Sequence, residues 1–222
     1  MDYSHYTLIA DIFRYPDEHY KENVARCEEL MINSYPEIYK TAAPFFDFVR
    51  KTNPQEIEYV FGKTFHIQAI CYLDLGYVLF AEDYKRGDFL VKVKNEQEKV
   101  NNDCGIELAD NLPNVLTLMT LFEDHDFREE FAERILYVAL QKMLEEFEAS
   151  RSILKDKVRM KKQRVIIMQD LENVNSYSFI IDALCKIVKS DFNIIEKPQV
   201  FDPTIYSTRD VLSHTKRNLP FN

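Results

Sequence analysis

Glycine and proline are scarce in this chain of 222 residues. It has four glycines and eight prolines, and no proline occurs between Pro54 and Pro113 or between Pro113 and Pro198. Long segments are rich in Glu, Lys, Leu, Ala and Met, which favour helix over sheet. Hydrophobic residues make up 46% of the chain, enough to bury a large core, so a disordered chain is excluded. The composition predicts an all-α protein.

Cysteines are also few and far apart. The four of them include no Cys-x-x-Cys pair and have no neighbouring histidine: Cys27, Cys71, Cys104 and Cys185. The sequence therefore predicts neither a metal site nor a disulfide framework. No apolar run is long enough to span a bilayer, and residues 1–5 lack the features of a secretory signal. We expect a cytoplasmic protein without stable membrane insertion.

The formal charge is −9 at pH 7, and most of the acidic excess lies within residues 1–110. Such a surface repels polyanions such as nucleic acid and attracts a cationic peptide, with a strength that falls as salt rises. The alternative interpretation is ordinary charge that keeps the protein soluble.

Proline positions predict where the first helices end. The apolar face of residues 8–13 stops before Pro16, and a second helix is expected to end at about Ser34, before Pro36. Residues 53–56, Asn-Pro-Gln-Glu, combine an N-cap, a proline at the first helical position and a glutamate that returns a hydrogen bond. The apolar face of the second helix is expected to contain Tyr20, Val24, Cys27 and Met31.

The most apolar part of the sequence is residues 65–80. It predicts a central helix buried on several sides, with a buried β-strand as the alternative. His66, inside this segment, is expected to be a hydrogen-bonded core histidine and not a metal ligand. Residues 83–87 are expected at a helix junction or in a tightly packed first turn, and residues 101–105 in a loop.

Capping signals predict the later helices. Asp110 or Asn111 can cap a helix that holds Pro113 in its first turn. Asp126, with a glutamate three residues later, predicts the start of a long helix over about residues 127–149. The apolar stripe of this helix is expected to contain Phe131, Ile135, Ala139, Met143 and Phe147.

A last helix is expected over residues 176–189, and the helical pattern stops beyond Asp191. We therefore expect one helical domain, residues 1–190, followed by an extended C-terminal tail, residues 191–222. The basic segment 151–164 is expected to be a loop or an exposed helix. A regulatory or ligand-sensing protein that contacts nucleic acid through this segment is the alternative function.

Signals for catalysis are weak. Residues 62–64, Gly-Lys-Thr, match the end of a phosphate-binding loop, but Ile57 stands where the first glycine of that loop belongs. Residues 123–126 could bind a cation, yet the sequence has no Glu-x-x-His pair for a di-iron site, and a polar helix junction is favoured. We expect no enzymatic activity and no cofactor.

Three short motifs follow one another in residues 71–113. Cys71-Tyr72-Leu73 precedes residues 84–87, Tyr-Lys-Arg-Gly, which precede residues 107–113, Glu-Leu-Ala-Asp-Asn-Leu-Pro. In order and spacing, these motifs resemble the maturation chaperones of molybdoenzymes, in particular the nitrate reductase delta-subunit (NarJ/TorD-like) family. Residues 8–16 also resemble the opening of that family, a leucine-rich helix that ends at Tyr-Pro.

This resemblance implies a helical bundle that acts as an assembly chaperone. Its partner would be the apo catalytic subunit of a molybdenum oxidoreductase, bound near that subunit's amino terminus until the molybdenum cofactor is inserted. The resemblance leaves open which molybdoenzyme is the client, and whether the chaperone is a monomer or a homodimer. The client-binding residues it implies are Tyr72, Tyr84, Arg86, Glu107, Asp110, Asn111, Leu112 and Pro113.

Each of these motifs also has a structural interpretation. Asp110 or Asn111 can serve only as a helix cap, because capping itself favours these residues. Arg86 is expected to pair with a carboxylate, that of Asp83, Asp88 or Asp110, while Gly87 lets another backbone approach closely. The alternative for Tyr72, with Leu75 and Tyr77, is packing in the core.

Overall fold

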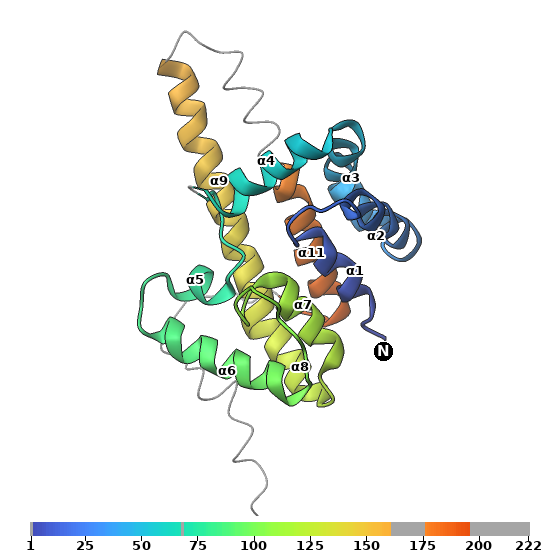
Figure 1. The fold of residues 1–222 in the computed structure, drawn as a ribbon, viewed down its shortest axis with the longest axis vertical. Helices are drawn as coiled ribbons and strands as arrows, with labels where there is room; N and C mark the ends of the chain where they lie inside the picture. The colour runs from blue at the N-terminus through green and yellow to red at the C-terminus, as the bar shows by residue number, and fades with distance from the viewer. Residues whose placement is uncertain (1, 68, 161–175, 196–222) are drawn as a thin grey trace, which may run out of the picture.

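The computed structural model describes residues 2–67, 69–160 and 176–195 (Figure 1). Within these ranges the regular secondary structure is helical, and β-structure is limited to one isolated bridge. The helices enclose one hydrophobic core. This arrangement confirms the predicted all-α, single-domain bundle. In the same ranges, every helix falls short of the length and apolarity that crossing a membrane requires.

The first two helices follow the sequence prediction. α1 (His5–Ile12) ends before Pro16, and α2 (Tyr20–Ser34) ends just before Pro36. The two helices pack against each other. All four residues expected on the apolar face of α2 are buried: Tyr20, Val24, Cys27 and Met31.

α3 (Pro36–Lys51) is a helix that the sequence pattern did not indicate. Pro36 occupies its first position, where the missing N–H costs no hydrogen bond, but Pro44 lies inside the helix and obscures the pattern. α4 (Pro54–Phe65) starts as predicted. The Asn53 side chain accepts a 2.9 Å hydrogen bond from the amide of Glu56.

The prediction of one continuous helix over residues 65–80 is wrong. α4 ends at Phe65, and only α5 (Leu75–Phe80) is helical in the rest of the segment. The intervening chain pairs instead with residues 110–112. The Leu75 amide donates to the Asp110 carbonyl at 3.0 Å, and the Leu112 amide donates to the Leu73 carbonyl at 2.8 Å. Backbone groups used in this way cannot close a helix.

α6 (Lys85–Lys99) and α7 (Leu112–Leu121) flank the predicted loop. Residues 83 and 84 precede α6 and residues 85–87 form its first turn, so of the two alternatives the helix junction is confirmed. The turn is not tightly packed, because Gly87 is exposed with open space around it. Asn111 occupies the N-cap position of α7, but its side chain accepts no hydrogen bond from the helix. The predicted cap position is therefore confirmed at Asn111, but the side-chain hydrogen bond that usually accompanies such a cap is absent.

A long helical path follows, made of α8 (His125–Phe131), a π-helical turn η1 (Ala132–Leu136) and α9 (Tyr137–Met160). Its cap is Asp124 and not the predicted Asp126. The Asp124 carboxylate accepts a 3.0 Å hydrogen bond from the Phe127 amide. The expected apolar stripe is buried throughout: Phe131, Ile135, Ala139, Met143 and Phe147.

α11 (Ser176–Asp191) confirms the last predicted helix and completes the bundle. It packs between α3 and α9, while α1 contacts α7 and α5 contacts both α6 and α9 (Figure 1). The basic segment is helical up to Met160 at the end of α9. Its remaining residues, 161–164, and residues 196–222 of the expected tail lie outside the described residues.

Candidate functional site

The three motifs found in the sequence meet in space. Asp74 and Asn111 form an isolated antiparallel β-bridge, and the Asn111 side-chain amide donates a 3.0 Å hydrogen bond to Asp74 Oδ1. The Arg86 guanidinium lies 3.7 Å from Asp74 Oδ2. Arg86 therefore pairs with a carboxylate, as expected. Its partner is Asp74, and not Asp83, Asp88 or Asp110.

Asp110, next to Asn111 in this bridge, is buried and bonds to the backbone of α5. Its side chain has no exposed surface, and its Oδ2 accepts a 2.8 Å hydrogen bond from the Gly76 amide. Oδ1 has no hydrogen-bond partner among the described residues. Burial raises the pKa of the Asp110 carboxyl, as does nearby Asp74, against the lowering effects of the Gly76 amide and Arg86. Asp110 thus positions α5 from within and offers no charge to a partner at the surface.

Close backbone approach in this region requires Gly76 and not Gly87. A Cβ atom at position 76 would lie 2.6 Å from Asp110 Oδ2 and 3.0 Å from Phe89 Cδ1. A Cβ atom at Gly87 would meet nothing within 4 Å. The expectation that Gly87 allows a backbone contact is therefore wrong, and Gly76 is the position where only glycine fits.

The other motif side chains differ in exposure. Tyr72 packs on Tyr77 with 4.3 Å between ring centroids, and the Arg86 guanidinium lies 5.1 Å from the centre of the Tyr77 ring. Tyr72 keeps about a third of its surface exposed, whereas Tyr84 is 80% exposed. Tyr72 and Tyr84 are thus available to a partner.

At the other end of the motif region, Glu107 is exposed, while Leu112 and Pro113 are buried in the first turn of α7. Leu112 and Pro113 therefore shape the site, and Glu107 is an acidic motif residue that a partner can reach.

A cavity of about 270 Å³ lies beside the bridge, and we call it the Tyr15 cavity. Its apolar lining comes from the turn after α1, from α4, from the chain beside the bridge, from the loop before α7 and from the start of α7: Phe13, Tyr15, Phe61, Leu73, Ile106 and Pro113. Its polar lining includes Arg14, His66, Glu107 and Asn111. Apolar walls with a few polar groups are typical of a ligand or peptide site.

Two of the residues that line this cavity are themselves exposed apolar side chains. Tyr15 is 59% exposed, and Ile106 is fully exposed at the tip of its loop. Ile67 and Leu108, which adjoin lining residues in the sequence, are also exposed. A group of exposed apolar residues around a cavity indicates an interaction surface.

The loop wall of the cavity is acidic. No lysine or arginine occurs between Lys99 and Arg128, whereas Asp103 and Glu107 are both exposed in this loop. On the facing wall, Arg14 lies 3.4 Å from Asp11, which offsets its charge. Of the two charged residues that line the cavity, Arg14 already has a carboxylate beside it, so Glu107 is the lining group that a cationic group of a partner could meet.

Sequence reasoning missed most of the cavity. His66 was expected in the core, but it is exposed at the cavity edge, where its ring lies 5.4 Å from that of Phe61 and 6.3 Å from that of Tyr15. The one local signal was Ile106, an apolar residue after a glycine in a polar loop. The other walls come together only through the fold.

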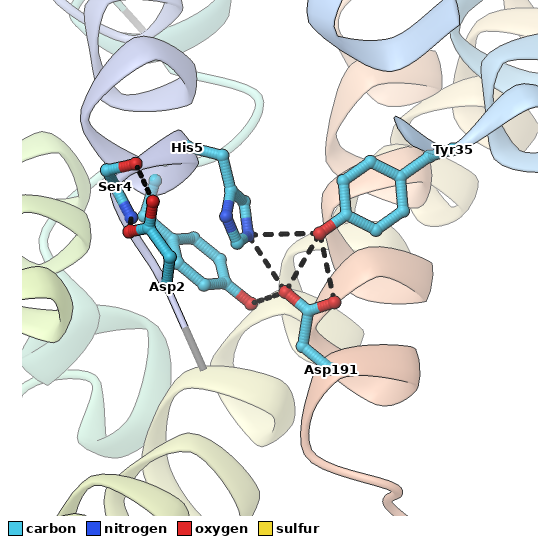
Figure 2. A network of polar contacts seen from close by, with 6 residues as sticks. Asp2, Ser4, His5, Tyr35 and Asp191 are labelled. Atoms are coloured by element: carbon cyan, nitrogen blue, oxygen red, sulfur yellow. Dashed lines mark hydrogen bonds and ion pairs between the residues drawn. The ribbon is translucent and has the colours of Figure 1, made fainter. Parts of the chain in front are cut away.

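A second polar cluster, which we call the Asp191 cluster, joins α1 to the end of α11. The Asp191 carboxylate accepts hydrogen bonds from the hydroxyls of Tyr6 and Tyr35 and lies 2.8 Å from His5 Nε2. Figure 2 shows His5 and Tyr35 converging on this carboxylate. Burial raises the pKa of both tyrosines. The polar groups of these four side chains are thus paired with one another, and the cluster holds α1 against the end of α11.

Metal-binding residues do not gather at either place. Across the described ranges, no group of three or more His, Cys, Asp or Glu side chains is arranged to hold a metal ion. Residues 123–126 instead form the polar junction that was expected, since Asp124 caps α8 there.

Comparison with known proteins gives no further assignment: no protein-family model matches the chain, and no curated protein matches it. The fold and the cavity thus define an all-α protein with a small, largely apolar cavity beside the loop that carries Glu107.

Proposed function

We propose that this chain is a cytoplasmic assembly chaperone that binds the apo catalytic subunit of a molybdenum oxidoreductase through a peptide near that subunit's amino terminus. One observation carries the proposal. Three of the four segments that resemble the chaperone family, although far apart in the sequence, contribute lining residues to the Tyr15 cavity, and residues 84–87 do not: the contributions are residues 13–15, Leu73, and Glu107, Asn111 and Pro113. A shared binding site explains why these segments occur together.

The cavity suggests how the client peptide would bind. One apolar side chain would enter between Phe61 and Ile106, and a neighbouring cation would meet Glu107. Full burial of one apolar side chain is worth about 1.5–3 kcal/mol. An exposed ion pair adds about 0–1 kcal/mol. Two such contacts give weak binding, so the client must also use the surrounding apolar rim and the exposed Tyr72 and Tyr84.

The proposed role needs no chemistry from the chaperone. A bound amino-terminal segment keeps the client from export or membrane docking while its molybdenum cofactor is inserted. The chaperone itself would hold no cofactor and catalyse no reaction. Its overall negative charge fits a cationic client segment and opposes binding to nucleic acid.

Coexpression with candidate molybdoenzyme subunits, followed by a pull-down at low salt, tests this function. We expect one such subunit to be retained, and its retention to fall as salt is raised. Ile106→Asp and Glu107→Lys should each reduce retention. The matched controls are Val91→Asp on α6 and Glu29→Lys on α2, both at exposed positions that do not line the cavity.

Two results would contradict the proposal. The first is the absence of any retained molybdoenzyme subunit at low salt. The second is salt-dependent binding to arbitrary duplex DNA, which would favour the regulatory protein that uses segment 151–164.

A further inference from the structure

The Tyr15 cavity and the loop beside it form a surface that fits a copy of itself. We propose that two copies of this chain associate about a twofold axis, with Ile106 of each copy seated in the Tyr15 cavity of the other. All the residues that form this contact lie in the described part of the chain. The contact does not depend on the proposed chaperone function.

Ile106 is the projecting side chain of this surface. It is fully exposed among the described residues, and it follows Gly105, whose φ of 62° is one that glycine adopts readily. Ile106 also lines the Tyr15 cavity, so the projection and the hollow lie side by side. A twofold axis lets each copy insert its projection into the hollow of the other at the same time.

The size of the cavity suits one side chain. Its volume is about 270 Å³, just below the roughly 300–1,000 Å³ that is typical of pockets for small molecules. A cavity of about 150 Å³ with apolar walls already holds a benzene molecule, so an isoleucine side chain fits. The walls that would contact it include Phe13, Phe61 and Leu73.

The loop that carries Ile106 is held in place from within. The side-chain amide of Asn114, a buried residue of α7, donates hydrogen bonds to the carbonyls of Cys104 at 3.2 Å and Leu108 at 2.9 Å. These two carbonyls lie two residues before and two residues after Ile106. A loop that is already ordered loses little conformational entropy when it binds, which favours association.

The charges of the cavity lining suit a second copy. Arg14 and Glu107 both line the cavity, one of each sign. When Ile106 enters, the adjacent Glu107 approaches the rim that carries Arg14 of the other copy. Asp11 lies 3.4 Å from Nε of Arg14, but the Arg14 side chain stays 46% exposed and can make a further contact. The twofold axis repeats this pair of opposite charges.

The dimer is expected to be weak. Each copy contributes one inserted side chain, and interfaces below about 1,200 Å² are typical of transient complexes. The charge of −9 on each copy also opposes association. We expect a dissociation constant on the order of 0.1 mM. Where the cavity also binds a client, as proposed above, the second copy would cover it until a client arrives.

Sedimentation equilibrium of the full chain measures the association. Between about 1 µM and 1 mM, the average mass should rise from that of one chain towards that of two, given the weak interface expected. A mass that stays at one chain up to the highest concentration would overturn the dimer.

Ile106→Asp should raise the dissociation constant at least about tenfold, because it places a charge in an apolar cavity. Val91→Asp is the matched control, since Val91 is also exposed but does not line the cavity, and it should leave the constant unchanged. Ile106 is exposed, so its substitution should also leave the melting temperature unchanged. A dimer that is insensitive to Ile106→Asp would use another face, which overturns the proposed seat.

A mixing experiment tests the twofold arrangement. The Arg14→Glu chain and the Glu107→Arg chain should each dimerise more weakly than the unsubstituted chain, because like charges then meet twice. In an equal mixture, both pairs of the mixed dimer again join opposite charges, so association should recover. A change within one chain cannot produce this recovery. A mixture that associates no better than the two variants alone would contradict the arrangement.

Cys104 reports whether the cavity is covered. It lines the cavity and is partly exposed, whereas Cys27, Cys71 and Cys185 are buried. Its labelling by a maleimide should slow as protein concentration rises, and in the Ile106→Asp chain it should be independent of concentration. Labelling that is independent of concentration in both chains would overturn the proposal. None of these measurements includes a client, so their outcome is separate from that of the pull-down.

Discussion

The amide of Gly76 donates a 2.8 Å hydrogen bond to Asp110 Oδ2, and a Cβ atom at position 76 would come within 2.6 Å of that same oxygen. The two residues are 34 positions apart. Their contact joins α5 to the turn before α7 and thereby fixes one wall of the Tyr15 cavity.

Gly76→Ala should destabilise the protein by about 1–3 kcal/mol, because the added methyl group must displace either the Asp110 carboxylate or the Phe89 ring. Urea unfolding measures the change. Gly87→Ala is the matched control: it lies in the first turn of α6 with open space around it, so it should be neutral or stabilising by up to about 1 kcal/mol. Equal effects at the two positions would refute the close contact.

Asp110→Asn should change how stability depends on pH. The pKa of Asp110 is raised from its ordinary value of 3.8 in the folded protein, so the native state holds this proton more tightly than the unfolded chain does. Its stabilising contribution is complete below 3.8 and is lost as the pH rises through the native pKa. Relative to the Asp110→Asn variant, the unsubstituted protein should lose stability over that window.

Unfolding curves of both proteins over a series of pH values measure this difference. If the unsubstituted protein instead gains stability relative to the Asp110→Asn variant as the pH rises, the folded state favours the carboxylate. That result would contradict the effect of burial on the pKa of Asp110. Asp110→Leu provides a further comparison, since it leaves the Gly76 amide without an acceptor and should cost about 1–3 kcal/mol.

Asp124→Ala should lower stability by about 0.5–2 kcal/mol, because it removes the carboxylate that accepts from the Phe127 amide at the start of α8. Asp126→Ala removes an acidic residue two positions later that only favours the helix dipole, so about 0.3–1 kcal/mol is expected. Thermal unfolding of the two variants under the same conditions gives the ranking. The reverse ranking would mean that Asp126 is the cap after all.

Asp191→Ala should be among the most destabilising substitutions of an acidic residue. The carboxylate is 9% exposed and accepts from two tyrosine hydroxyls beside His5, so its loss should cost about 3 kcal/mol. Asp182→Ala on the same helix removes only an exposed pair with Lys186 and should cost under about 1 kcal/mol. Chemical denaturation measures the free energy of unfolding of both variants. Similar losses would show that the Asp191 cluster does not stabilise the fold more than an exposed ion pair does.

The sequence predicted the helices whose ends carry local signals. Pro16 and Pro36 mark where α1 and α2 stop, and Asn53 marks the start of α4, because capping and proline chemistry act within a few residues. The same local reasoning placed the later cap two residues away, at Asp126, because Glu129 completes the capping pattern there, whereas Phe127 stands three residues after Asp124.

The prediction of a continuous helix over residues 65–80 was wrong for a different reason. Apolar composition reports burial, but it does not report whether a backbone amide bonds to its own segment or to a distant one. The carbonyl of Leu73 and the amide of Leu75 pair with residues 110–112, and no periodicity reveals that choice. The candidate site was predictable only as far as its motif residues, because the fold alone brings residues 13–15 and His66 beside Glu107.

The Asp191 cluster also sets an order of events during synthesis on the ribosome. His5 and Asp191 are 186 positions apart. At about 5–20 residues per second, roughly 10–40 seconds pass between the synthesis of the two residues. Throughout that interval the hydroxyls of Tyr6 and Tyr35 lack their acceptor, so the first helix of the nascent chain cannot take its final position until the last described helix has been made.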